Sequence, residues 1–419
     1  MQFAIERNIQ MADIISGNMR FNGNKNSRLV HRDDTQDDEL IDVKIHRHKK
    51  RTRIIIIAAV AALIIAVLIG IFLSNSITYS SYSITKAVNR DDSSSSKYTE
   101  YNGGYIRYSN DGAAYYDSNG GQVWNKTFSM QKPQLKVCGD SVAIGDVNGN
   151  TIYIFNKSGE QGTVETQYKI AQVEVAGQGV VAAVLTDDTT NYINLYDKSG
   201  SIIYTVKTSL SGDGYPVDMS ISEDGTKLVA SYVYVGGEEM DTNIVFYNFS
   251  SVGQNETERV VGGFKDFGSI IAGDVQFISN SLAVAVGEDR MAIYKMDEYP
   301  SLSKTVMLSG EVQRVFFDET HIGIVSTNND SADPYKLEVY NTSGSMLFSA
   351  TYDIAYTQIK FDNNNVVLSD ASSFALINLR GKTLTKQSVE LPLTNLLYTG
   401  SRGKYILVSS KFIQYIKLK

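Results

Sequence analysis

The sequence predicts an all-β protein, an eight-bladed β-propeller that follows a single N-terminal transmembrane helix. Two patterns support this prediction. A short strand that ends in an aromatic residue or Ile and a polar turn recurs at a mean spacing near 43 residues, which is typical of four-stranded propeller blades. A long apolar stretch precedes the recurring units, and no other segment has the period of an amphipathic helix.

Residues 1–53 are polar, and we expect them to form a mostly disordered cytoplasmic tail. They carry 11 Lys/Arg and 8 Asp/Glu, and they lack the apolar content that a folded core needs. Six of the basic side chains lie in residues 44–53, directly before the apolar stretch. A basic flank of this kind is typical of the cytoplasmic side of a membrane helix.

Residues 54–73 are twenty consecutive uncharged, predominantly apolar residues. As a helix they would extend about 30 Å, the thickness of the hydrocarbon core of a bilayer. The seventeen residues that follow carry only two Lys/Arg. This charge difference predicts a single-pass protein of the cell membrane, with its N-terminus in the cytoplasm and residues 74–419 outside the cell.

Residues 74–419 are expected to form the propeller. The strand-and-turn pattern occurs eight times, and each unit divides into four strands, which we label a, b, c and d in chain order. The alternative is seven blades, if one irregular unit is miscounted. The residues near the ends of the eight c strands are Tyr116, Phe155, Tyr196, Tyr247, Tyr294, Tyr340, Ile377 and Ile416.

The last unit ends with its c strand at the final residues of the sequence and therefore lacks a strand d. Residues 78–90 have the pattern of a spare strand, and we expect them to supply the missing one. Such pairing would remove the open edge of the last blade. The alternative is that residues 78–90 form a flexible stalk.

A resemblance to a known family rests on the anchor, the eight units and the stretch DGAAYYDSNGGQVWNKTF, residues 111–128. Together they resemble a bacterial family of single-pass, membrane-anchored propellers that is known only as a domain of unknown function. The turn DSNGGQVW is also similar to quinoprotein repeats, in which an aromatic side chain packs between blades. SISEDGTKLVAS resembles the YVTN-type repeats of lactonase-like propellers. These resemblances imply a fold, and they bring no catalytic residues.

The composition argues against most enzymes built on this fold. A single cysteine, Cys138, excludes the adjacent cysteine pair of quinoprotein dehydrogenases and any intrachain disulfide. His321 is the only histidine after the apolar stretch, so a zinc site built from histidines is excluded. We therefore expect a non-enzymatic protein with no catalytic residues and no cofactor. The alternative is a cell-surface hydrolase or lyase that uses carboxylate, Tyr and Lys side chains in the central pore.

The turn GDVNGN offers a weak metal-binding candidate. Asp146, Asn148 and Asn150 carry side-chain oxygens at alternate positions. An EF-hand loop would require Glu at its twelfth position, where this chain has Lys157. Asp, Asn and Gly are also the residues of ordinary hairpin turns. We expect a hairpin here, and divalent cations shared between several loops remain an open alternative.

The b–c loops are strongly acidic. Seven of them contain twelve Asp/Glu and one Lys/Arg, whereas seven c–d loops contain six Asp/Glu and five Lys/Arg. Turn chemistry alone would enrich Asp on both faces of the ring, so the difference indicates a face that attracts cations or basic partners. The candidate partner-binding residues are Asp187, Asp188, Glu238, Glu239, Asp241, Glu288, Asp289, Asp330 and Asp333.

We expect this acidic face to point away from the membrane, because strand d of the last blade starts just after the apolar stretch. The partner would be a basic protein or a cell-wall component, and the net charge of −7 argues against nucleic acid. A further alternative is a transmembrane sensor in which residues 1–53 signal inside the cell. The sequence does not identify the ligand or the oligomeric state.

Overall fold

The computed structural model describes residues 48–67, 77–93, 95–236, 239–330, 332–352, 356–362 and 365–419. The chain divides into two compact units, residues 1–75 and 76–419. In the first unit, residues 48–67 are helical. Within the described ranges, no helix is both long and apolar enough to cross a membrane. The predicted tail up to residue 47 and residues 68–73 of the predicted span lie outside the described residues.

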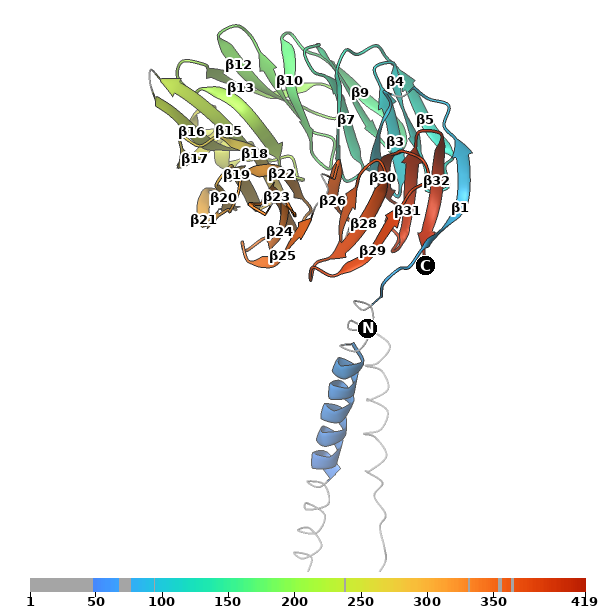
Figure 1. Cartoon of the computed structure of the whole chain (residues 1–419). Helices are drawn as coiled ribbons and strands as arrows, with labels where there is room; N and C mark the ends of the chain where they lie inside the picture. Colours follow the sequence, from blue (N-terminus) through green and yellow to red (C-terminus); the bar gives the residue numbers. More distant parts are fainter. Residues whose placement is uncertain are drawn as a thin grey trace, which may run out of the picture. The chain divides into compact units, whose positions relative to one another are not determined.

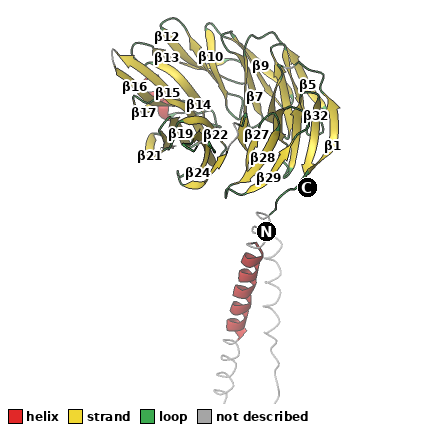
Figure 2. Cartoon of the chain, viewed as in Figure 1, coloured by secondary structure: helices red, strands yellow, loops and turns green. Residues whose placement is uncertain are grey.

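The second unit consists almost entirely of strands (Figure 2). Its described residues form eight four-stranded sheets, and in each sheet neighbouring strands are antiparallel. The first strands of successive sheets contact one another, so strand a is the innermost strand of each blade. The prediction of an all-β, eight-bladed propeller is confirmed, and the seven-bladed alternative is wrong.

The inner two strands of each blade are strands a and b. Strands a, from blade 1 to blade 8, are β2 (Lys97–Tyr101), β6 (Pro133–Cys138), β10 (Lys169–Val175), β14 (Tyr215–Ile221), β18 (Ala272–Ser279), β22 (Val312–Phe317), β26 (Gln358–Asp362) and β30 (Leu393–Tyr398). Strands b are β3 (Gly104–Ser109), β7 (Ser141–Asp146), β11 (Val181–Thr186), β15 (Lys227–Gly236), β19 (Leu282–Gly287), β23 (His321–Thr327), β27 (Asn365–Ser369) and β31 (Lys404–Ser409).

The outer two strands are strands c and d. Strands c are β4 (Gly112–Tyr116), β8 (Thr151–Asn156), β12 (Thr190–Tyr196), β16 (Glu239–Asn248), β20 (Arg290–Met296), β24 (Tyr335–Asn341), β28 (Ser373–Asn378) and β32 (Phe412–Leu418). Strands d are β5 (Gln122–Thr127), β9 (Gly159–Glu165), β13 (Ile202–Ser209), β17 (Val260–Gly268), β21 (Pro300–Met307), β25 (Met346–Tyr352), β29 (Thr383–Ser388) and, for blade 8, β1 (Tyr82–Asn89).

Blade 8 is therefore built from both ends of the propeller sequence. β1 lies antiparallel to β32, with Tyr82 opposite Leu418 and Asn89 opposite Phe412 (Figure 1). β1 covers the edge of β32, which would otherwise expose a row of unpaired backbone groups. Because Tyr82 pairs with the end of strand c, the chain enters the propeller on the face that carries the c–d turns.

The recurring turn after strand c has a local physical cause. In blade 3, Asp197 Oδ1 accepts hydrogen bonds from the backbone N–H groups of Ser199 and Ser201, at 2.8 and 3.0 Å. Gly200 in the same turn has φ of +89°, a conformation that favours glycine. Asn341 makes the same pair of bonds in blade 6. This repeated Asx turn produces the sequence period.

The hydrophobic core is divided among the gaps between blades. Eight buried clusters each join two neighbouring blades, and together they connect the whole ring. In the gap between blades 1 and 2, Trp124 stacks on Phe155 with ring centroids 4.7 Å apart. Its indole Nε1–H donates to the carbonyl of Asn156 at 3.0 Å. The aromatic residue after the DSNGG turn therefore packs between blades.

Blade 4 departs from the predicted pattern at both ends. β15 and β16 are ten residues each, and their pairing continues as far as Gly236 opposite Glu239. The connection from β16 (Glu239–Asn248) to β17 (Val260–Gly268) is also longer than the c–d connections of the other blades. Two short 3₁₀ helices, η1 (Val252–Asn255) and η2 (Thr257–Arg259), precede β17 there.

Candidate functional site

The three weak metal candidates of the GDVNGN turn bond to neighbouring loops of the protein. Asp146 Oδ1 accepts from the backbone N–H groups of Gln131 and Lys132, at 2.9 and 2.8 Å. Asn150 Nδ2 donates to the carbonyls of Thr166 and Tyr168, each at 3.0 Å. Asn148 has φ of +69°, as a tight turn requires. Across the described ranges, no group of three His, Cys, Asp or Glu is arranged to hold a metal ion.

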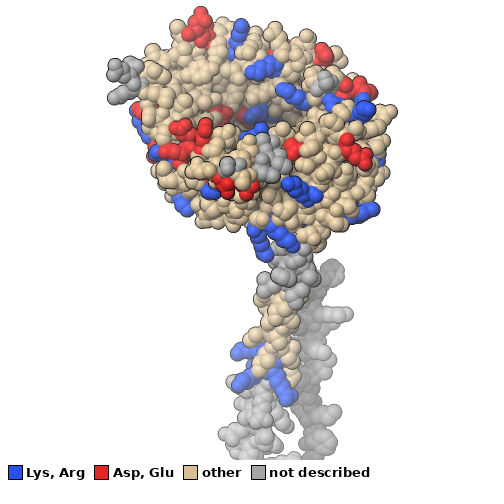
Figure 3. Space-filling view, viewed as in Figure 1, with Lys and Arg blue, Asp and Glu red and all other residues tan. Residues whose placement is uncertain are grey.

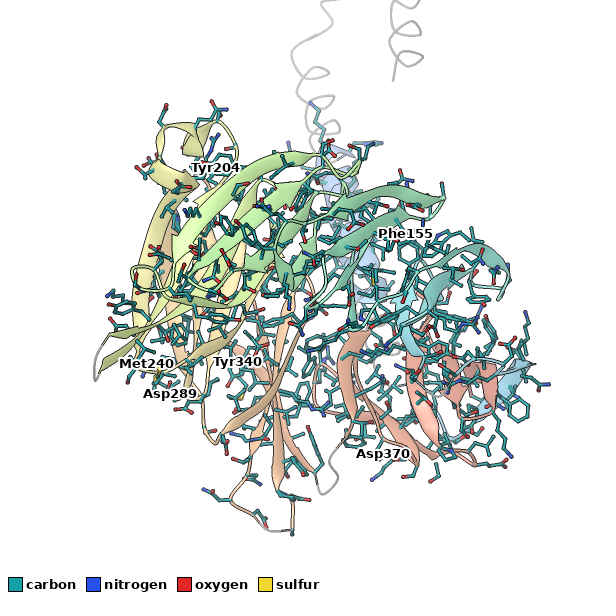
Figure 4. All side chains as sticks on the ribbon, turned by 90° about the horizontal axis from the view of Figure 1, so that it is seen from above. Phe155, Tyr204, Met240, Asp289, Tyr340 and Asp370 are labelled. Carbon is teal, nitrogen blue, oxygen red and sulfur yellow. The ribbon has the colours of Figure 1, made fainter. Side chains whose placement is uncertain are left out.

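The candidate carboxylates of blades 3 and 5 lie in the hairpins between strands b and c. Asp188 is exposed, and Asp187 Oδ1 accepts its backbone N–H at 2.8 Å. Glu288 is exposed at the tip of the β19–β20 hairpin. Its neighbour Asp289 forms an ion pair with Arg290 at 2.8 Å, which lowers the pKa of Asp289. Figure 4 labels Asp289 among the side chains of this hairpin.

The remaining candidates belong to blades 4 and 6. Asp241 pairs with Lys265 of β17 at 2.9 Å. Asp330 Oδ1 accepts the backbone N–H of Ala332 at 2.9 Å, and Asp333 Oδ2 accepts from the Thr351 hydroxyl at 3.2 Å. Glu239 is the first residue of β16, whereas Glu238 lies outside the described residues.

The structure changes the charge count of these hairpins in two ways. Two of the nine candidate carboxylates, Asp241 and Asp289, are paired with basic side chains. Blade 8 also has a b–c hairpin, which contains the exposed Lys411 and was not among the seven loops counted from the sequence. Four exposed candidates, Asp187, Asp188, Glu288 and Asp330, have no ion pair with the described part of the chain.

The centre of the ring is a second charged region. Figure 3 shows a hollow there with positively and negatively charged side chains inside it. Polar side chains of strands a supply this region, because these strands are innermost. Its charged residues are Glu100, Lys136, Glu174, Asp218, Asp274, Arg314 and Lys360. The sequence alone indicates no residue of the pore, since these side chains lie on seven different strands that are far apart in the chain.

Lys136 stands among three of the carboxylates. It pairs directly with Glu174 of the next blade. Burial acts to lower the pKa of Lys136, but Glu174, Asp218 and Asp274 together raise it above its ordinary value. Burial raises the pKa of each of the three carboxyl groups, and the mutual repulsion of Asp218 and Asp274 adds to this for Asp274. The positive charge of Lys136 therefore offsets part of the negative charge of these three carboxyl groups.

Hydrogen bonds between strands a use the same carboxyl and amide side chains. Gln172 Nε2 donates to Asp218 Oδ1 at 2.6 Å, and Asp218 Oδ2 accepts the backbone N–H of Val275 at 2.8 Å. Across the ring, Glu100 pairs with Lys360 and accepts a backbone N–H from Tyr398. The bonds that involve Asp218 and Tyr398 link neighbouring blades, and the Glu100–Lys360 pair joins blade 1 to blade 7. These central charges therefore help to hold the ring together.

His321 and Cys138 are the only histidine and the only cysteine of residues 74–419. His321 Nδ1 lies 3.0 Å from both carboxylate oxygens of Asp318, three residues earlier in the chain. Burial, with nearby acidic residues, raises the pKa of the Cys138 thiol to about 11, so it stays protonated and unreactive near neutral pH.

Comparisons with known proteins give a family and a fold. A family model described as "Family of unknown function (DUF5711)" matches residues 75–418. No curated protein matches the chain. A solved structure with a similar fold is BamB from Moraxella catarrhalis, at 12% identity and a TM-score of 0.52, over 81% of this chain and 100% of that one.

A second similar structure is Sqt1 from Chaetomium thermophilum bound to the N-terminus of the ribosomal protein L10. It shares 10% identity at a TM-score of 0.50, over 75% of this chain and 93% of that one. A structure described as the eukaryotic initiation factor shares 10% identity, also at a TM-score of 0.50, over 81% of this chain and 87% of that one. At such identities the likeness establishes the propeller fold alone.

Proposed function

The chain belongs to the DUF5711 family of unknown function, and from this premise we propose that it is a membrane-anchored extracellular scaffold that binds a basic protein partner through its acidic b–c hairpins. The observation that carries the proposal is the unequal charge of the turns. Twelve Asp/Glu against one Lys/Arg in seven b–c loops is not matched in the c–d loops. Loops on a rigid scaffold are the usual place for recognition.

Structural neighbours support a binding role without identifying a partner. The Sqt1 propeller is bound to a segment of another protein in its solved structure. The charges at the centre of this chain are engaged in bonds between blades, which leaves the exposed hairpins as the freer recognition surface. Unpaired carboxylates there would speed the encounter with a basic partner more than they would add to the final affinity.

The membrane part of the proposal rests on the sequence. Residues 54–73 would be the anchor, and the basic residues before them would stay in the cytoplasm. The chain enters the propeller at Tyr82, on the face of the c–d turns. We therefore assign the b–c hairpins to the side away from the membrane, where a partner in the cell wall or on another protein can reach them.

The test begins with cross-linking of the full-length protein on intact cells, followed by identification of the captured partner. A four-residue variant, Asp187→Asn, Asp188→Asn, Glu288→Gln and Asp330→Asn, removes the exposed carboxylates that lack ion pairs. The association rate with that partner should fall about tenfold at low ionic strength, and the difference should shrink in high salt. Surface plasmon resonance with a salt series measures both effects.

The matched control neutralises four exposed acids outside the b–c hairpins. These are Glu223, Asp297, Glu298 and Glu319. This variant should bind like the unmodified protein, because its changes lie on the opposite face. The proposal is wrong if the two variants bind equally well, or if the captured partner is held with no dependence on salt.

A further inference from the structure

A cavity of about 570 Å³ lies between blades 3 and 4. It opens between their outer strands, β13 and β17, and its inner wall comes from β15 and β16 of blade 4. This volume is in the range of pockets that hold small organic molecules. The residues that line it include Val206, Thr208, Tyr232, Val245, Tyr247 and Gly263.

The cavity exists because β17 departs from a regular strand. Its pairing with β16 is interrupted by register shifts on both sides of the segment Gly262–Phe264. Gly263 lines the cavity, and a Cβ atom there would meet only the carbonyl of Ile244, at 3.9 Å. At Gly262, by contrast, a Cβ would lie 2.4 Å from Pro300 of blade 5. Gly262 therefore allows blades 4 and 5 to pack closely, whereas Gly263 leaves the cavity open.

The inner wall carries two buried hydroxyl groups. The phenolic oxygens of Tyr232 and Tyr247 are 2.8 Å apart, and the two residues are 1% and 2% exposed. Burial raises both pKa values, that of Tyr232 to about 12. Both groups are therefore protonated at neutral pH and offer hydrogen bonds without charge. Thr208, on β13, adds a third hydroxyl to the lining.

A fourth polar group in the same gap has no partner. Asn191 is 1% exposed, and neither its amide oxygen nor its amide nitrogen has a hydrogen-bond partner within the described residues. It lies opposite Thr208 in the β12–β13 ladder. On β12 it shares a face with Ile193, which packs in one cluster with Tyr232 of blade 4. An unsatisfied buried amide is costly, and a hydrogen-bonding molecule in this gap would relieve that cost.

The rim of the cavity stores backbone strain. Glu258 and Arg259 have φ of +51° and +64°, in the left-handed region that these residues seldom adopt. Glu258 lines the cavity. The Arg259 guanidinium lies 4.8 Å from the ring centroid of Tyr204 on β13. This contact joins the η1–η2 loop of blade 4 to blade 3. Figure 4 shows Tyr204 beside this yellow loop.

We propose that this cavity binds a small neutral molecule with an apolar, ring-sized body and one or two hydrogen-bonding groups. The body would pack against Val206 and Val245, and its polar group would reach the tyrosine hydroxyls and the Asn191 amide. The charged residues around the cavity are two lysines and two acids, Lys207, Lys265, Asp213 and Glu258. Because the four charges sum to zero, we expect the cavity to prefer a neutral molecule over an ion. This proposal does not rest on the partner-binding role of the acidic b–c hairpins.

The test uses the neutral fluorescent amine N-phenyl-1-naphthylamine as the probe, with the full-length protein in detergent. Fluorescence should rise to saturation at one probe per chain. Gly263→Leu should reduce binding at least tenfold, because the new side chain occupies the cavity. Gly273→Leu is the matched control: it is also an exposed glycine in a strand with no atom within 4 Å of an added Cβ, and it should bind normally.

A second measurement tests the hydrogen-bonding part of the proposal. Displacement of the probe by 2-naphthol should be about fivefold more effective than displacement by naphthalene, since only the former satisfies buried polar groups. Asn191→Leu should weaken that preference while leaving naphthalene binding unchanged. Equal probe binding by Gly263→Leu and the unmodified protein overturns the proposal, as does the absence of saturable binding. If Gly263→Leu does not fold, the smaller Gly263→Val replaces it.

Discussion

Asp362 makes the stability of the propeller depend on pH in an unusual direction. It ends strand a of blade 7, is 3% exposed, and accepts hydrogen bonds from Tyr405 of blade 8 and from Asn365 Nδ2, the latter at 2.9 Å. Burial outweighs these bonds and raises the pKa of Asp362 to about 6. The carboxyl group therefore lies within a blade interface and is easier to bury when protonated.

The sign and size of the effect follow from linkage. Because the folded pKa of Asp362 lies above the unfolded one, the native state binds the proton more tightly. The resulting stabilisation is complete below about pH 4 and is lost as the pH rises through about 6. A gap of about two pKa units corresponds to about 3 kcal/mol of unfolding free energy.

The variant Asp362→Asn keeps the shape and cannot ionise. It should be as stable as the unmodified protein or slightly less stable near pH 4, and more stable by about 2–3 kcal/mol at pH 7.5. Urea unfolding from pH 4 to pH 7.5 measures the difference between the two proteins, in which the contributions of other titrating groups cancel. A difference that does not change with pH would refute the reasoning.

Asp370 provides the matched control with the opposite slope. Although burial acts to raise its pKa, bonds from the backbone and hydroxyl groups of Ser372 and Ser373 lower the pKa below its ordinary value. Its stabilisation is therefore present above the unfolded pKa and is lost in acid. Asp370→Asn should be destabilising near pH 7 and close to neutral at low pH. Finding the same slope for both variants would contradict both assignments.

Three further changes test how the ring is held together. Deletion of residues 77–90 exposes the edge of blade 8, so the protein should melt at lower temperature and self-associate in light scattering; an unchanged, monomeric product would contradict this. Trp124→Ala removes the ring stack and the bond to Asn156 and should cost about 3–5 kcal/mol in urea unfolding, and Trp124→Phe should cost clearly less. Lys136→Met leaves Glu174 unpaired and should cost about 1–3 kcal/mol at pH 7 but less at low pH, whereas a loss independent of pH would point to packing alone.

The fold was predictable because its signal is local and repeated. Each strand c ends with a large residue that packs against the preceding blade, as Phe155 and Tyr247 do. The Asx turn that follows needs Asp or Asn at its start and often glycine near its end, as in Asp197 and Gly200. Both requirements concern neighbouring residues, so the sequence displays them repeatedly along the chain. The spare N-terminal strand was visible for the same reason, since the last unit lacked one.

The central charges and the cavity were not predictable, because each depends on contacts between distant strands. Lys136 and Asp274 lie on strands of blades 2 and 5, and nothing in either strand alone indicates that both face one hollow. The cavity depends on the irregular pairing of β17 and on the missing side chain of Gly263. In the sequence, Gly262 and Gly263 look alike, and only the position of Pro300 distinguishes their roles.

Blade 4 departs from the repeat at two places, the connection after strand c and the b–c hairpin. Six blades connect strands c and d by short turns or loops, whereas blade 4 inserts η1 and η2 there and extends its b–c hairpin to ten-residue strands. Gly253 is the one buried residue of η1 and η2. These additions frame the cavity at one end and carry Glu239 and Asp241 at the other. Lys265 joins the two regions, since it lines the cavity and pairs with Asp241. If both proposals hold, a molecule bound in the cavity would lie beside Lys265, and so next to the hairpin that carries Asp241.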